Sequence, residues 1–252
     1  MTQEKQWDRE YRDQTFLTNE NDPQSDVVRF VRFLKKEFKK VATSVGSASA
    51  DVASSENFAG FENLKVLDLG CGTGRNSFYF AELGASVVGL EISSKAIEIA
   101  EQNLLQANKM SSSDLDISYK KQSIGEKFPL VDSSVSIALD VTSSNSLSEA
   151  EREVYLSETA RVLCPGGHFL VKALCKDSDT NAKNLLKTNP GREADTYILP
   201  DTGICERVFS HDDFLQTYQK FFTILHLEKK TSYTRMSGRL YKRNFWIAYL
   251  KK

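Results

Sequence analysis

The sequence predicts an α/β fold with a mostly parallel sheet of seven strands, helices on both faces and an antiparallel hairpin at the C-terminal end. Two observations predict it. Short apolar runs alternate with segments of helical periodicity from residue 65 to residue 174, and two further apolar runs follow near the C-terminus. The predicted strands are 65–69, 85–90, 117–122, 135–140, 168–174, 223–229 and 244–250.

Helices are predicted between these strands from apolar periodicity and from capping residues. The first begins at Ser25 or Asp26 and presents apolar side chains as far as Phe38. The helix after the first strand stops at Gly84, and the helix before the fifth strand stops at residues 165–167, Pro-Gly-Gly. These two helices are predicted at 76–83 and 149–163, and two further helices are predicted at 94–108 and 212–222.

The chain of 252 residues is long enough for one sizeable α/β core. We expect residues 1–60 to form an N-terminal helical lid followed by a flexible linker, because 43–57 is rich in Ser and Ala and has no period. We expect residues 61–252 to form the main domain, with a polar insert near 176–205. Long polar loops in compact domains often act as lids.

Composition narrows the possible partners. The formal net charge is −1, which does not favour nucleic acid as a partner, although a basic stretch between 229 and 243 leaves it possible. We interpret that stretch as a solvated hairpin whose Lys and Arg side chains protect an edge strand. No apolar run reaches membrane-spanning length, the first residues are polar and charged, and the four cysteines lack metal-binding spacing. A cytoplasmic protein with reduced thiols and no metal is therefore expected, and its oligomeric state stays open.

The most informative segment is the turn after the first strand. Asp68 and Leu69 lead into Gly70-Cys71-Gly72-Thr73-Gly74-Arg75, a helix follows, and the second strand ends at Glu91. Glycines at these positions allow a tight turn and let a ligand approach the backbone. A dinucleotide fold requires G-x-G-x-x-G, whereas here the third glycine comes one position early. The pattern predicts a nucleoside site at the carboxyl ends of parallel strands.

At these residues the chain resembles the class I S-adenosylmethionine-dependent methyltransferases. Residues 66–74, Val-Leu-Asp-Leu-Gly-Cys-Gly-Thr-Gly, resemble that family's first motif, and residues 89–93 resemble its second. Residues 132–138 and 161–170 resemble its fourth strand and the turn into its fifth. The resemblance implies a Rossmann-like fold, S-adenosylmethionine as cofactor and S-adenosylhomocysteine as product.

The resemblance also implies roles for particular residues. Glu91 would bind the ribose, Ile92 would pack on the adenine, and Ser123 and Ile124 would meet the adenine edge, although the carboxylate common there is missing. Asp140, at the end of the fourth strand, would face the cofactor. The residues expected around the methionine part are Asp68, Gly70, Cys71, Gly72 and Gly74.

Methyl transfer needs mainly alignment, because the sulfonium is already a strong electrophile. If the acceptor must lose a proton, Asp140, His211 and Glu206 are the candidate general bases. Asp140 has an equally weighted alternative role as the cap of the turn at 142–144. No acid–base constellation stands out in the sequence.

Three residues are candidate substrate contacts. Trp7 and Tyr11 lie in a segment that resembles the N-terminal lid of the tellurite-resistance and thiopurine methyltransferase groups; the alternative is a surface helix anchored by two aromatic side chains. Arg207 follows the polar insert and could line a substrate pocket.

The sequence thus favours a methyltransferase that acts on a small molecule. The alternatives are an RNA or protein methyltransferase and a non-catalytic S-adenosylmethionine-binding protein. The chain lacks the proline-containing run after the fourth strand that base-modifying enzymes use, which argues against a nucleic-acid substrate. A nicotinamide dehydrogenase is disfavoured by the glycine spacing.

Overall fold

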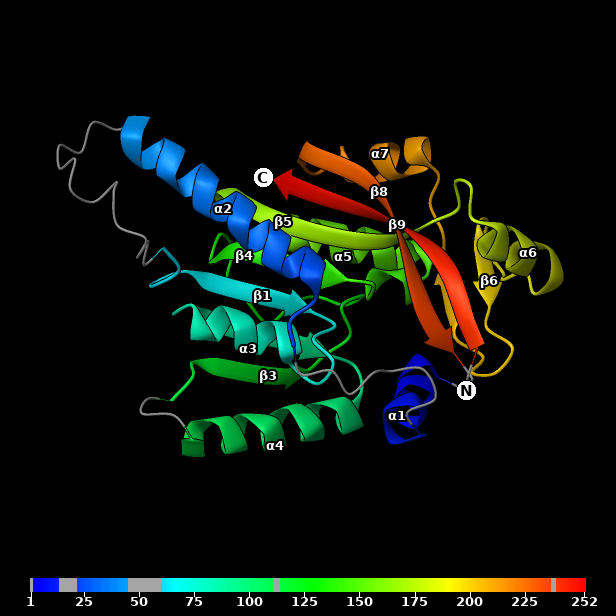
Figure 1. The fold of residues 1–252 in the computed structure, drawn as a ribbon, viewed down its shortest axis with the longest axis horizontal. Helices are drawn as coiled ribbons and strands as arrows, with labels where there is room; N and C mark the ends of the chain where they lie inside the picture. The colour runs from blue at the N-terminus through cyan, green and yellow to red at the C-terminus, as the bar shows by residue number, and fades with distance from the viewer. Residues whose placement is uncertain (1, 14–21, 45–59, 111–113, 237–238) are drawn as a thin grey trace.

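The computed structural model describes residues 2–13, 22–44, 60–110, 114–236 and 239–252 (Figure 1). The predicted Ser/Ala-rich linker lies almost wholly at 45–59, outside the described residues. None of the helices in the described part of the chain is long and apolar enough to cross a bilayer.

A seven-stranded sheet forms the centre of the molecule, in the order β3-β2-β1-β4-β5-β9-β8. All neighbouring pairs from β3 to β5 are parallel, and β9 is antiparallel to both β5 and β8. The predicted fold class is confirmed. The strands are β1 Lys65–Leu69, β2 Ser86–Glu91, β3 Ile117–Lys121, β4 Val135–Val141, β5 Leu163–Cys175, β8 Thr223–Met236 and β9 Arg239–Lys251.

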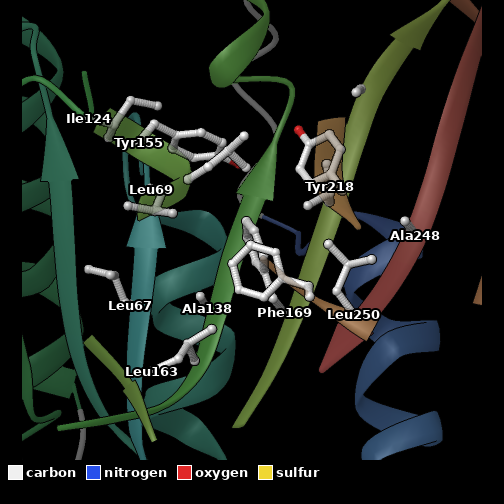
Figure 2. Packing of buried hydrophobic residues seen from close by; sticks show 14 of the residues in the cluster. Leu67, Leu69, Ile124, Ala138, Tyr155, Leu163, Phe169, Tyr218, Ala248 and Leu250 are labelled. Atoms are coloured by element: carbon white, nitrogen blue, oxygen red, sulfur yellow. The ribbon is translucent and has the colours of Figure 1, made fainter. Parts of the chain in front are cut away.

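Helices cover both faces of the sheet and bury two separate apolar cores. Side chains from α2 and α3 pack on one face with Val66 and Ile137, and those from α5 and α7 pack on the other face with Leu67 and Phe169. Figure 2 shows the second core, where Phe169 lies among Ala138, Leu250 and neighbouring side chains. The helices are α1 Gln3–Asp13, α2 Ser25–Ser44, α3 Arg75–Glu82, α4 Ser94–Met110, α5 Glu149–Val162, α6 Thr180–Thr188 and α7 His211–Tyr218.

The junction between α5 and β5 differs from the prediction. We expected a loop at 165–167 and a strand from 168, but β5 already begins at Leu163. Its pairing with β4 joins Leu163 to Val135 and then His168 to Ile137, so the register shifts and the intervening residues bulge out. The bulge accommodates Pro165, Gly166 and Gly167 inside a strand.

The polar insert contains regular structure. It holds α6, whose first turn is capped by Asp179, and the first strand of a small hairpin, β6 Thr196–Ile198 with β7 Cys205–Arg207. Arg243 of β9 forms an ion pair with Glu206 of this hairpin, with 2.7 Å between Arg243 Nη2 and Glu206 Oε2. The interpretation of the basic stretch as fully solvated is therefore wrong for Arg243, which is 8 % exposed.

Candidate functional site

A cavity opens at the carboxyl ends of β1, β2 and β4, as the order of parallel strands predicts. In Figure 1 the arrowhead of β1 points to the side of the molecule on which α1 lies, and Gln3, Trp7 and Tyr11 of α1 line the cavity. The cavity is lined by Gln3, Trp7, Tyr11, Gln24, Asp68, Gly70, Cys71, Gly72, Thr73, Arg75, Asn76, Glu91, Ile92, Ile99, Ser123, Ile124, Val141, Thr142, Ser143, Ser146 and Leu147.

The glycine turn forms the floor of the cavity in a conformation that favours glycine. Gly70 and Gly72 have φ of 68° and 57°. A Cβ on Gly70 would lie 2.3 Å from Ser143 Oγ, and one on Gly72 would lie 2.6 Å from the Tyr11 hydroxyl. Gly74 lies outside the cavity lining; a Cβ there would lie 2.2 Å from the Tyr119 hydroxyl, so this glycine permits packing of β3 under the turn.

Glu91 ends β2 and is held by two backbone amides. Its Oε2 accepts from Gly72 N at 3.0 Å and its Oε1 accepts from Ser93 N at 2.9 Å. Burial raises the pKa of Glu91, while hydrogen bonds from these amides oppose the shift. The carboxylate thus joins the glycine turn to the start of α4, in the position expected of a ribose ligand.

Asp68 lies on β1 immediately before the turn. Its Oδ2 accepts from Ser77 Oγ at 2.7 Å. Burial raises the pKa of Asp68 to about 6, with Asp140 contributing in the same direction and Ser77 and Arg75 opposing. A cationic ligand group next to Asp68 would favour its charged form.

Asp140 lies near the end of β4, where the two roles considered for it were a residue facing the cofactor and a cap of the following turn. It is fully buried and does not line the cavity. Its Oδ1 accepts from Ser143 N at 2.9 Å and from Ser144 N at 3.2 Å, and its Oδ2 accepts from the Tyr155 hydroxyl at 2.6 Å. These are the contacts of the alternative role, a cap that fixes the loop after β4 so that Thr142 and Ser143 line the cavity.

The N-terminal helix α1 covers the cavity from outside. Trp7 and Tyr11 both line it, with ring centroids 6.4 Å apart. Burial and the nearby Glu91 raise the pKa of the Tyr11 hydroxyl. This is the placement that the lid hypothesis requires.

Side chains of α1 hold it against two separate parts of the molecule. Asp8 Oδ1 accepts from Ser93 Oγ at 2.7 Å and from Lys95 N at 3.1 Å, at the start of α4. Gln6 and Arg9 donate to the carbonyls of Gly203 and Thr202 in the turn between β6 and β7, at 2.8 and 2.6 Å. The insert therefore supports α1, whereas Ser93 connects α1 to Glu91.

Two of the candidate residues lie elsewhere. His211 begins α7, is about half exposed and contacts Asp212 at 3.0 Å, outside the cavity lining. Arg207 is mostly buried, pairs with Asp213 at 2.9 Å and with Glu149, and lies over the Phe209 ring. Its contacts are those of a structural ion pair between β7, α5 and α7.

The structure brings together most of the predicted cofactor residues and adds others. Asp68, Gly70, Cys71, Gly72, Glu91, Ile92, Ser123 and Ile124 all line the cavity. Arg75 and Asn76 follow the glycine turn directly, so their position in the sequence could have indicated them. Gln3 and Gln24 precede the turn by more than 40 residues, and nothing in their local sequence indicates the site. Across the described ranges, no group of three or more His, Cys, Asp or Glu side chains is placed to hold a metal ion.

Comparison with known proteins finds a similar family over the residues that form the cavity floor. Residues 66–167 match the family described as "Methyltransferase domain". These residues include the glycine turn, Glu91, Ser123 and Ile124, so the matched region contains most of the cavity floor. Residues 66–167 of this chain therefore resemble a methyltransferase domain.

The relatives of this domain are similar over about half of their length. A methyltransferase from Synechocystis sp., itself uncharacterized, is 36 % identical over 49 % of this chain and 53 % of its own. A ubiquinone biosynthesis O-methyltransferase from Chelativorans sp. is 31 % identical over 45 % of this chain and 42 % of its own. The chain thus spans about half the length of these curated relatives.

The fold comparison extends over more of the chain. The crystal structure of an S-adenosylmethionine-dependent methyltransferase from Methanosarcina mazei matches with a TM-score of 0.64 and 24 % identity, over 75 % of this chain and 92 % of the other.

Proposed function

We propose that the protein transfers the methyl group of S-adenosylmethionine to a small-molecule acceptor. The strongest support is that the residues matched by the methyltransferase family also form the cavity. The glycine turn and Glu91 lie inside residues 66–167 and form the floor of the cavity. We also propose that the protein is related to the tellurite-resistance and thiopurine methyltransferase groups.

The residues present fit the cofactor. Gly70 and Gly72 line the cavity, and the absence of a Cβ at each lets Ser143 and Tyr11 pack closely against the turn. Glu91 would bind the ribose hydroxyls, Asp68 the amino group, and Ile92, Ser123 and Ile124 the adenine. When bound, the cofactor supplies an electrophilic methyl group on a sulfonium.

The protein's own contribution is alignment and exclusion of water. Trp7 and Tyr11 close the cavity from α1, and Thr142 and Ser143 line it from the loop after β4. Positioning of this kind supplies much of the rate in such reactions. Asp140 and His211 remain only proposed as general bases; the contacts of Asp140 favour its capping role and the position of His211 lies outside the cavity lining.

The lid supports a small acceptor over a macromolecular one. A helix laid across the cavity leaves room for a compact molecule, whereas a nucleic acid or a folded protein would require its displacement. The ubiquinone-pathway relative is named for O-methylation of a small molecule, and we extend only that class to this chain. Four free cysteines fit the proposed cytoplasmic location.

Titration calorimetry with S-adenosylhomocysteine, S-adenosylmethionine and NADH tests the proposal. We expect binding of the first two at a dissociation constant on the order of micromolar and none of NADH. Absence of binding by both sulfur ligands would refute the cofactor. Binding without methyl transfer to any member of a small-molecule panel would favour the non-catalytic alternative.

The raised pKa of Asp68 predicts a pH dependence of binding. Above about pH 6 the carboxylate is charged and attracts the ligand's ammonium group; below that pH it is protonated and the attraction is lost. Affinity for S-adenosylhomocysteine should therefore fall as pH decreases from 8 to 5, by up to about tenfold per unit below pH 6. Asp68→Asn should bind more weakly at pH 8 and show a flatter profile. A wild-type affinity that does not change over this range would contradict the assignment.

A further inference from the structure

The helix α2 is strongly basic in a chain that is almost neutral. Six basic residues against two acidic ones give this helix a net charge of +4. The whole chain has a formal net charge of −1, so all the other residues together carry −5. The basic residues of α2 are Arg29, Arg32, Lys35, Lys36, Lys39 and Lys40.

These six side chains, which we call the basic face of α2, lie on the side of the helix that is turned away from the sheet. Arg32 follows Arg29 by three positions and Lys36 follows Arg32 by four, and such steps place side chains on neighbouring turns of one helix face. The opposite face carries apolar side chains such as Phe30, which are buried against the sheet (Figure 1). Two members of the basic face, Arg29 and Lys35, are half-buried, and the other four are exposed.

The acids near this face neutralise only part of its charge. Asp26 is buried, lies 4.0 Å from Arg29 between Oδ1 and Nη1, and forms closer ion pairs with lysines of β5 and β8. Glu37 pairs with Lys40 at 2.6 Å, and Glu228 of β8 pairs with Arg29 at 2.6 Å. Within the described part of the chain, three members of the basic face form no ion pair: Arg32, Lys35 and Lys36. Positive charge therefore remains on this face after its ion pairs are counted.

The aromatic side chains of α2 are turned into the core. The ring centroids of Phe30 and Phe33 lie 5.0 and 4.9 Å from that of Tyr249. Phe38 packs on Phe61 of the same core, with 6.1 Å between the ring centroids. Proteins that bind single-stranded nucleic acid stack its bases on aromatic rings beside basic groups. The helix itself thus offers exposed charge without rings on which bases could stack.

We infer that the basic face of α2 docks on an anionic phospholipid bilayer. Clusters of about four to eight Lys and Arg residues on an amphipathic helix are typical of binding to anionic lipids. A bilayer is a flat surface that contacts one face, whereas a nucleic acid would extend over neighbouring parts of the molecule, which are acidic in sum. Because the apolar face of α2 is buried in the core, the attraction comes from charge without insertion, and salt weakens it. The inference is independent of the proposed function.

Co-sedimentation of the protein with lipid vesicles tests the inference. Binding is compared between vesicles of phosphatidylcholine alone and vesicles that also contain about 30 % phosphatidylserine. Each comparison is made at about 0.05 M and at about 0.5 M salt, because screening separates charge attraction from other contacts.

Two triple variants separate the position of the charge from its amount. Glutamine has a helix propensity close to that of Lys and Arg, so both variants should keep the fold, and circular dichroism checks this. The test variant removes three charges from the basic face: Arg32→Gln, Lys35→Gln and Lys36→Gln. The matched control removes three charges from exposed positions on α6 and after α7: Lys183→Gln, Lys187→Gln and Lys220→Gln.

We expect the wild type to bind the phosphatidylserine vesicles at about 0.05 M salt and to bind phosphatidylcholine at least about tenfold more weakly. Raising the salt to about 0.5 M should lower the affinity at least about tenfold. The test variant should lose at least about tenfold in affinity for the acidic vesicles, whereas the matched control should stay within about twofold of wild type. Lys36→Gln alone, at an exposed position, should lose about fivefold.

Other results overturn the inference. If the wild type does not bind the acidic vesicles at about 0.05 M salt, or if the test variant and the matched control lose equally, the basic face is only a solvated surface. Tighter binding of a short RNA or DNA duplex than of the vesicles, lost in the test variant, would assign the face to nucleic acid instead. Should the test variant fail to fold, unchanged vesicle binding by Lys36→Gln would contradict the docking surface.

Discussion

Replacing Glu91 with alanine is expected to lower the affinity for S-adenosylhomocysteine by about 100-fold, which corresponds to about 2.7 kcal/mol. Without the carboxylate, both ribose hydroxyls of the ligand would lose their proposed hydrogen-bond acceptor. Its removal also leaves Gly72 N and Ser93 N without their partner, at 3.0 and 2.9 Å, so the turn and the start of α4 lose a shared anchor. Calorimetry on purified, folded variants provides the measurement.

Glu98→Ala is the matched control for this variant. Glu98 lies on α4, about half exposed, and pairs with Lys95 at 2.9 Å. We expect it to bind the ligand within about twofold of wild type, since surface pairs contribute little. If Glu91→Ala retained the affinity of the control, the nucleoside would have to lie elsewhere.

Replacing Asp140 with alanine is expected to lower the free energy of unfolding by about 3–5 kcal/mol. The change leaves the amides of Ser143 and Ser144 and the Tyr155 hydroxyl without an acceptor in a fully buried site. Urea denaturation followed by circular dichroism measures the loss. Asp114→Ala, at an exposed position, should change stability by less than about 0.5 kcal/mol.

Asp140→Asn separates the structural role of this residue from a catalytic one. The amide keeps one acceptor oxygen for the loop but cannot act as a base. We expect a smaller loss of stability, about 1–2 kcal/mol, together with retained S-adenosylhomocysteine binding. If Asp140→Ala unfolded at the same urea concentration as wild type, the capping role would be wrong and the catalytic hypothesis would gain support.

The cofactor half of the site could be predicted from sequence because it is local. Asp68, the glycine turn and Glu91 are separated by a single helix and two short strands, so the order of apolar runs and glycines places them at one edge of the sheet. The turn requires positive φ at Gly70 and Gly72, and only glycine adopts it without strain. The same locality made the parallel arrangement of the strands from β1 to β5 predictable.

Elements with weak local patterns were predicted less well. The bulge at the start of β5 keeps Pro165 and Gly166 inside a strand because pairing with β4 overrides their turn preference. Arg243 was expected to be solvated, but Glu206 from the insert pairs with it and buries it. A single strand's sequence does not contain the partner that decides such a position.

The sequence by itself determined the sheet, the glycine turn and the acid at the end of β2, because these follow from periodicity and backbone sterics within short segments. Only the tertiary structure decided which distant side chains complete the cavity. Gln24 and Lys172 meet across 148 positions, and Asp8 reaches Ser93 across 85. Contacts of that span form when the helices pack on the sheet, and packing depends on surfaces contributed by the whole chain.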